Sequence, residues 1–418
     1  PASPGLGALA GVAVIGAVLF ARLPSEYAPT EDRGMVVMML RGPEGATPAY
    51  MDRQLRLVER TLAPYVQAGV AKRVVARTGM WGAGGDVSSG FIYMPLNDWG
   101  QRSLSSPEIA QELRRKLDRI PGVTAQVFLP PSLGVRGGGQ PLQVVLGGTS
   151  YEELVQWRDK LMDRIRRENP RIVGLRSDFF EQKPKIRVAV DRERASDLGV
   201  SVTAVGRTLE TMLGSRIVTT FVDRGEEYNV VLQARPEDRA SPSDLGNIYA
   251  RSATTGGLIP LASLVSLRES AGPRELKRFN RLRAITLIGG LAPGYSLGDA
   301  LAYMDKVIRE ELPPEAHIDY DGESREFMST GNAIYFTFLL ALLISFLVLS
   351  AQFESFRHPL IIMLTVPLAI TGGLLGLWLI GSSINVYSQI GAIMLIGLAA
   401  KNGILIVEFA NQLRDRGE

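Results

Sequence analysis

The stretch from Pro359 to Ala400 reads PLIIMLTVPLAITGGLLGLWLIGSSINVYSQIGAIMLIGLAA and contains no Asp, Glu, Lys or Arg. Residues 1–21 and 327–353 are equally free of these charged side chains. Nearly all of the charge therefore lies between Arg22 and Glu326. Because a bilayer excludes charge from the segments that cross it, this segregation predicts a membrane protein with one large water-exposed insert.

The apolar stretches predict four transmembrane helices, since about 20 apolar residues are needed to cross a bilayer. Pro367 should kink the third helix, and the Gly381-Ser382-Ser383 triplet should separate the third from the fourth. Three of these apolar runs lie close together near the C-terminal end. This disfavours the alternative that they are buried helices in the core of a soluble protein. The predicted helices cover residues 1–22, 330–350, 359–380 and 388–410.

The orientation follows from the basic residues that flank the helices. Arg357 lies in the short loop between residues 352 and 358, and Arg414 and Arg416 lie in the C-terminal tail. The positive-inside rule places both segments in the cytoplasm, and the insert on the opposite side of the membrane.

Composition excludes several classes of function. The chain has 46 basic and 43 acidic residues, so it offers no electrostatic case for a nucleic-acid partner. It has no cysteine and only two histidines, His317 and His358, which lie far apart in sequence. No P-loop motif is present, and Gly137-Gly138-Gly139 reads as a flexible connection. We therefore expect no cofactor, no metal and no enzyme activity, and we favour ion-coupled transport.

The insert predicts an α+β fold built from two similar units. Its apolar periodicity alternates between the spacing typical of strands and that typical of helices. The first unit has the order β-α-β-β-α-β of a ferredoxin-like fold. Its predicted elements are residues 35–40, 48–65, 71–76, 90–96, 107–120 and 123–129.

The second predicted unit repeats this order but is interrupted. Its strands and helices fall on residues 142–146, 151–167, 172–176, 284–289, 296–311 and 317–320. The interruption, residues 185–268, is large enough to be a separate module. It contains predicted strands at 185–190 and 228–232 and a helix at 203–212, and residues 219–227 read as the tip of a hairpin.

Several motifs along the chain resemble those of one transporter family. Leu96-Asn97-Asp98-Trp99 is similar to an L-x-D-W motif, and Val188–Asp191 with Leu198–Ser201 resembles the start of a docking subdomain. The most specific match is Gly397–Ala410, which reads GLAAKNGILIVEFA. The chain thereby resembles the resistance-nodulation-division (RND) efflux pumps, in their hydrophobe/amphiphile efflux branch.

This resemblance implies the roles of the predicted segments. Residues 30–133 would form one ferredoxin-like porter subdomain, residues 134–184 with 269–325 a second, and residues 185–268 a docking subdomain. The chain would be most of the second half of a pump. The family implies a homotrimer in the bacterial inner membrane, with a periplasmic adaptor protein and an outer-membrane channel, exporting amphiphilic or hydrophobic compounds in exchange for protons.

Lys401 is the one charged residue near the middle of the fourth predicted helix. A lysine at this depth costs about 3 kcal/mol unless it is paired or hydrated. Glu408 is about 10 Å further along the helix, at a rise of 1.5 Å per residue, which is too far for a direct pair. Lys401 therefore needs a carboxylate from outside this chain. In the family the matching lysine belongs to the proton relay.

The resemblance also implies a set of residues that line the substrate pocket. Residues 78–89 form a glycine-rich stretch that carries large apolar side chains. Positions that are aromatic in the family hold smaller or more polar residues here, which implies a pocket that is smaller in aromatic area and more polar. The predicted pocket residues are Met39, Val75, Arg77, Met80, Trp81, Tyr93, Gln143 and Arg176.

Two other functions remain open from the sequence. A heavy-metal exporter would use methionines, and Met35, Met38 and Met39 lie close in sequence. Strand alternation, however, places Met38 and Met39 on opposite faces. A scaffold or polymer-translocation protein would not need a charged residue such as Lys401 within a membrane helix.

Overall fold

A computed structural model describes residues 3–79, 87–131, 133, 140–181, 183–273 and 275–417. The chain divides into two compact units. Unit 1 comprises Pro1–Phe180 and Glu275–Glu418, and unit 2 comprises Glu181–Arg274. Unit 1 contains the apolar helices and two antiparallel sheets, and unit 2 contains three short two-stranded ribbons. Each unit is described below by itself.

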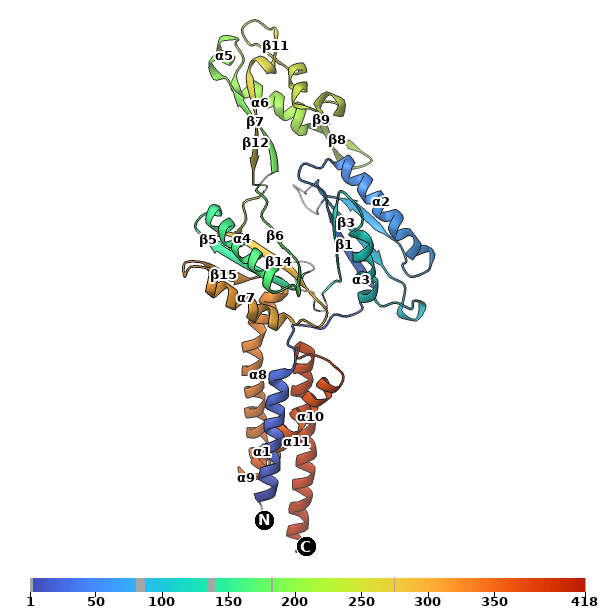
Figure 1. The fold of residues 1–418 in the computed structure, drawn as a ribbon, viewed down its shortest axis with the longest axis vertical. Helices are drawn as coiled ribbons and strands as arrows, with labels where there is room; N and C mark the ends of the chain where they lie inside the picture. The colour runs from blue at the N-terminus through green and yellow to red at the C-terminus, as the bar shows by residue number, and fades with distance from the viewer. Residues whose placement is uncertain are drawn as a thin grey trace. The chain divides into compact units, whose positions relative to one another are not determined.

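The helices α1, α8, α10 and α11 of unit 1 run side by side (Figure 1). Among the described residues, three spans are long and apolar enough to cross a membrane: Gly322–Gln352, Arg357–Leu379 and Val386–Arg414. A shorter apolar helix covers Gly7–Arg22. The bounds are α1 Ser3–Arg22, α8 Gly322–Gln352, α9 Arg357–Met363, α10 Thr365–Leu379 and α11 Val386–Asp415.

The third predicted helix is broken at Leu364, between α9 and α10. Pro367 has no N–H to donate to the carbonyl of Met363, and its ring would collide with that carbonyl. The helix therefore breaks one turn before the proline, and the expected kink at Pro367 lies upstream of the proline itself.

Helix α8 begins at Gly322, before the predicted start at residue 330. The Asp321 carboxylate accepts a hydrogen bond of 2.9 Å from the Gly322 N–H and so caps the helix. The prediction followed the apolar residues alone and missed this polar first part. One continuous helix thus joins the second sheet to the membrane segment.

The first sheet of unit 1 has the strand order β2-β3-β1-β4, and every neighbouring pair is antiparallel. Its bounds are β1 Met35–Arg41, α2 Pro48–Gln67, β2 Val75–Thr78, β3 Ser89–Pro95, α3 Ser106–Leu117 and β4 Thr124–Phe128. The predicted strand at residues 71–76 is wrong in its bounds. Ala71 makes only an isolated bridge to Leu96, since its N–H bonds to the Tyr65 carbonyl at the end of α2.

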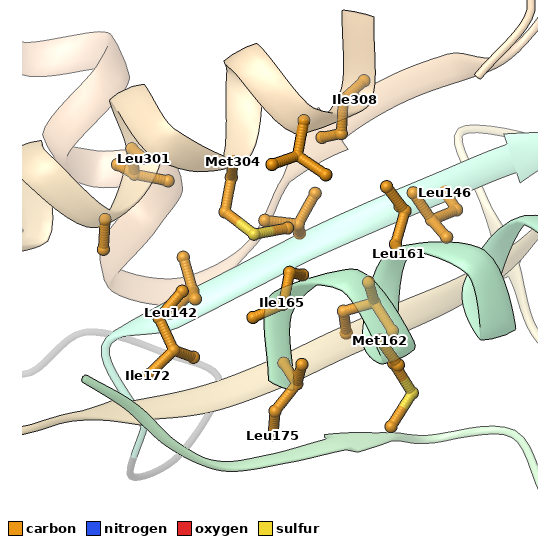
Figure 2. Packing of buried hydrophobic residues seen from close by; sticks show 14 of the residues in the cluster. Leu142, Leu146, Leu161, Met162, Ile165, Ile172, Leu175, Leu301, Met304 and Ile308 are labelled. Atoms are coloured by element: carbon orange, nitrogen blue, oxygen red, sulfur yellow. The ribbon is translucent and has the colours of Figure 1, made fainter. Parts of the chain in front are cut away.

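The second sheet places β5 between β14 and β15, and β6 and β13 both pair with β14. Helices α4 and α7 cover one face, where Ile165 and Met304 pack against Leu142 (Figure 2). The bounds are β5 Leu142–Gly148, α4 Tyr151–Glu168, β6 Ile172–Ser177, β13 Arg278–Phe279, β14 Leu282–Leu291, α7 Leu297–Glu311 and β15 His317–Tyr320.

Unit 2 contains residues 185–268, which the sequence predicts to be a separate module. It has its own hydrophobic core, around Ala195, Val205 and Leu261. Strand β7, at the start of unit 2 in sequence, pairs antiparallel with strand β12 at its end. The predicted helix at 203–212 is α-helical only to Leu209 and continues as a π-helical turn, Glu210–Ser215. The bounds are β7 Lys183–Val190, α5 Arg192–Asp197, α6 Val202–Leu209, β8 Arg216–Asp223, β9 Glu226–Leu232, β10 Tyr249–Arg251, β11 Leu258–Pro260 and β12 Val265–Gly272.

Candidate functional site

The first sheet has one face that its helices do not cover, called here the first open face. Strand β1 alternates, so Val36, Met38 and Leu40 are buried against α2 and α3, and the residues between them point the other way. Met38 and Met39 are thus on opposite faces, as predicted. Directly opposed residues of paired strands share a face. The register therefore places Val37, Met39, Arg41, Val75, Arg77, Phe91 and Tyr93 on the first open face.

Four of the predicted pocket residues lie together on this face: Met39, Val75, Arg77 and Tyr93. The Tyr93 ring stacks on Phe91 with ring centroids 6.4 Å apart. Phe91 was not predicted, although the apolar alternation of its strand could have indicated it. The face combines aromatic, aliphatic and cationic side chains.

The second sheet also has a face that α4 and α7 do not cover, called here the second open face. Ile288 of β14 lies directly opposite both Gln143 of β5 and Arg176 of β6, so the three form one row. Leu142 and Leu175 point to the helix-covered side. The predicted residues Gln143 and Arg176 therefore share the second open face.

Gln143 is only 4% exposed, because it is held against the start of α8. Its N–H donates to Ser324 Oγ at 3.0 Å, and its side-chain Nε2 donates to the Gln140 carbonyl at 3.0 Å. Ser324 Oγ donates in turn to the Pro141 carbonyl at 2.8 Å. The structure thus attaches Gln143 to a membrane helix, and its role in a pocket stays a prediction.

Arg176 is partly buried, and its Nε has no hydrogen-bond partner in the described structure. Burial lowers the pKa of the Arg176 guanidinium, and the positive charge of Arg41 lowers it further. Arg41 lies at the end of β1 on the first open face, and its Cζ is 4.2 Å from the centroid of the Phe180 ring. The first sheet therefore contacts, at Arg41, the segment that follows β6, which sequence reasoning missed.

Met80 and Trp81 lie outside the described residues.

Lys401 lies near the middle of α11 and is exposed. A neighbouring side of the helix packs inside unit 1, where Ala400 is buried with Leu349 and Ile362. A Cβ at Gly403 would come within 3.0 Å of Ile362, so α11 and α9 are in close contact there. Within the part of the chain that the structure describes, Lys401 forms no ion pair. Its flanking side chains are apolar and exposed: Met394, Leu398 and Leu405.

A bundle of apolar helices long enough to cross a membrane, which carries two sheets with helices packed on one face, is the architecture of a membrane protein with a large water-exposed part. The chain belongs to the AcrB/AcrD/AcrF family, whose model matches residues 4–418. The predicted RND family is therefore confirmed.

Relatives support the same family. The chain is 32% identical over 413 residues to a multidrug/solvent efflux pump membrane transporter, MepB, of Pseudomonas putida, covering 97% of this chain and 39% of the relative. It is 31% identical over 407 residues to the multidrug export protein AcrF of Escherichia coli, with coverages of 96% and 39%. An uncharacterized transporter of Haemophilus influenzae is 31% identical over 402 residues, with coverages of 94% and 38%. The chain spans about two fifths of the length of these relatives.

Proposed function

We propose that this chain is part of a proton-driven exporter of amphiphilic or hydrophobic compounds, working as the inner-membrane pump of a tripartite efflux system. Family membership, and relatives that are multidrug and solvent efflux pumps, support export of drugs or solvents. The apolar helices support a position in the membrane. The two sheets then stand in the periplasm.

The sheets support the proposed porter roles. In the first, the chain order is β-α-β-β-α-β and the spatial order is β4-β1-β3-β2, a pattern typical of ferredoxin-like units. In the second, the corresponding strands follow the order β15-β5-β14-β6. We assign residues 30–133, and 134–184 with 269–325, as porter subdomains, and residues 185–268 as a docking subdomain.

The observation that carries the proposal is the position of Lys401 on an exposed, otherwise apolar face of α11. An amine on such a face is costly in lipid, so the face is better explained as a contact for further helices that supply a carboxylate. Glu408 does not serve, because it lies two turns away and its Oε1 accepts from Gln412 Nε2 at 3.3 Å. The pairing carboxylate would come from the rest of the pump.

Such a pair converts proton binding into movement. While the carboxylate is ionised it attracts the Lys401 ammonium, and protonation removes that attraction. Lys401 can then turn to another acceptor, so the balance between two arrangements of α11 changes. Helices α1 and α8 connect this region to the two sheets and would pass the change to the substrate pocket.

The test is export by the full-length pump with Lys401→Ala, in a strain that lacks other pumps. We expect normal accumulation and assembly but loss of resistance and of proton-linked efflux. Lys401→Arg should also impair export, because a planar guanidinium does not replace a slim amine. Lys306→Ala, at an exposed site on α7, is the matched control. Full export by Lys401→Ala at equal protein level would remove Lys401 from the relay.

A further inference from the structure

Trp99, the last residue of the Leu96–Trp99 motif, is 71% exposed. It begins a short 3-10 turn, Trp99–Gln101, and Leu104 follows shortly after it with 36% exposure. A tryptophan side chain can bury about 150–250 Å² of mostly apolar surface, and its indole N–H favours a partner that is apolar on one side and wet on the other. The exposed ring therefore fits an interface better than bulk water.

The segment that carries Trp99 is held from inside by Arg102. The Arg102 side chain is only 1% exposed. Its Nε donates to the Asn97 carbonyl at 2.9 Å, and its Nη1 donates to the Leu104 carbonyl at 2.6 Å. One buried side chain thus joins the two ends of residues 97–104, called here the Trp99 loop. Trp99 is presented outward by a braced loop.

The Trp99 loop lies at the end of the first sheet that the membrane helix α1 leads into. Met35, the first residue of β1, is directly opposite Pro95, the last residue of β3. The chain enters β1 from α1, and it leaves β3 into the loop. Both connections are therefore at the same end of the sheet.

Printed contacts limit how far this end is from the membrane helices. The Val386 N–H, at the start of α11, donates to the Tyr27 carbonyl at 3.1 Å. Asp32 pairs with Arg102 of the loop at 2.6 Å. The chain from Tyr27 to Asp32 spans at most about 18 Å when fully extended. The loop is thus close to the point where α11 begins.

Basic side chains lie beside the loop. The Lys72 N–H donates to the Pro95 carbonyl at 2.9 Å, and Lys72 and Arg73 are both exposed. Lys72 Nζ is 3.1 Å from Asp98 Oδ1 in the loop itself. Tryptophan is enriched at the level of the lipid head groups, and basic side chains reach the lipid phosphates there. This combination favours a lipid surface as the partner.

We propose that the Trp99 loop is a membrane-surface anchor: Trp99, with Leu104, inserts among the lipid head groups of the leaflet that faces the sheets. The anchor would fix the height of the first sheet above the bilayer. This inference goes beyond export and does not depend on it, since it needs only that the apolar helices cross the membrane.

The test places a reporter beside an intact Trp99. Gly100→Cys suits this, because Gly100 is exposed and an added Cβ meets nothing within 4 Å. A full-length pump without other cysteines is labelled there with a nitrobenzoxadiazole fluorophore and reconstituted, without partner proteins, into phosphatidylcholine bilayers. Fluorescence is compared with and without phosphatidylcholine that carries a nitroxide on its head group. Ala49→Cys is the matched control, at an exposed site in α2, which follows the other end of β1.

We expect the nitroxide lipid to quench the label at Gly100→Cys severalfold more than the label at Ala49→Cys. Adding Trp99→Gln should weaken the quenching at Gly100→Cys, because the loop is then no longer drawn into the head groups. Trp99→Tyr should keep much of it, since tyrosine also favours this level of the membrane. The side chain of Trp99 is exposed, so these changes should leave folding unaffected.

Three results would overturn the anchor. Equal quenching at Gly100→Cys and Ala49→Cys would show no preferred contact of the loop with lipid, and unchanged quenching in Trp99→Gln would show that Trp99 does not hold the loop there. A Gly100→Cys thiol that cannot be labelled in the native pump, or a label that is shielded from an aqueous quencher only after partner proteins are added, would make the loop a protein contact instead.

Discussion

Ser25 and Ile384 form a parallel β-bridge that ties the end of α1 to the start of α11. The Glu26 N–H donates to the Ile384 carbonyl at 3.0 Å, and the Ile384 N–H donates to the Pro24 carbonyl at 2.8 Å. The carbonyl of Ser25 also accepts from the Gly298 N–H, at 3.0 Å, in the first turn of α7. One short segment thus contacts both the helix of Lys401 and a helix of the second sheet, so a shift of α11 has a direct route to that sheet.

Gly298→Ala should disturb this route without unfolding the protein. An added Cβ would lie 3.1 Å from the Ser25 carbonyl oxygen and 3.3 Å from the Phe327 ring. Overpacking of this kind costs about 1–3 kcal/mol, and the chain at Ser25 has to move. We expect export by the full-length pump to fall severalfold at an unchanged protein level.

The control for that change is Gly206→Ala in α6, where an added Cβ meets nothing within 4 Å. Resistance and substrate efflux are measured for both variants beside the wild type. Unimpaired export by Gly298→Ala would show that the contact between α7 and Ser25 does not transmit the movement.

Sequence periodicity predicted the amphipathic helices well, because their apolar faces are local patterns. The helix predicted at 151–167 is α4, Tyr151–Glu168, and that predicted at 296–311 is α7, Leu297–Glu311. Contacts between distant segments were not predictable in this way. Strand β12 was missed, since its residues pair with β7 across unit 2 and show no strong alternation.

The residues of the candidate site divide in the same way, into those that a local pattern predicts and those whose position depends on contacts between distant segments. Alternation along β1 separated Met38 from Met39, and the register then grouped Met39 with Tyr93. The approach of Arg41 to Phe180 depends on how the two sheets meet, which no local pattern encodes. Likewise the burial of Gln143 depends on the start of α8, far along the chain.

Asp32 should stabilise the first sheet in a pH-dependent way. Its carboxylate accepts from Arg102 Nη2 at 2.6 Å, from the Ser106 N–H at 2.9 Å and from the Gly34 N–H at 3.0 Å. Although burial acts to raise it, the pKa of Asp32 is held well below its ordinary value by the hydrogen bonds from Arg102 and Ser106. A carboxyl whose pKa is depressed by folding adds stability above its unfolded-state pKa of about 4, and that contribution is lost as the pH falls further.

We therefore expect Asp32→Asn to destabilise this region by about 2–3 kcal/mol at pH 7, and by less as the pH falls below about 4. Because the chain has no cysteine, an Ala110→Cys reporter in α3, at a site only 2% exposed, can measure local opening by thiol labelling. The control is Asp52→Asn, which breaks an exposed pair with Arg56 and should change little. Equal labelling rates for Asp32→Asn and wild type at pH 7 would contradict the assignment.

The hairpin of β8 and β9 should contact a second copy of the chain. Apolar side chains are exposed along it, with Phe221 54% and Val222 71% exposed. Its Phe221 ring stacks on Tyr228 of the same hairpin, at 5.6 Å between centroids. An isolated two-stranded ribbon is marginally stable in water, and exposed apolar patches of this kind mark interaction sites. The predicted tip, residues 219–227, lies in this hairpin, whose turn is Arg224-Gly225.

A Val222→Cys variant of the full-length pump, labelled with a thiol-reactive photocrosslinker, tests this contact. We expect irradiation to yield products of two and three chains, because burial of the hairpin in a neighbouring subunit would bring the label within reach of that subunit. Ser243→Cys in the same unit, an exposed site in a polar turn, is the matched control and should give mainly single chains. The purified protein is compared before and after denaturation, so that random collisions are excluded. If Val222→Cys gave only intramolecular products while the native pump remained oligomeric, the hairpin would have to pack on its own subunit, and the apolar side chains along it would need another cover.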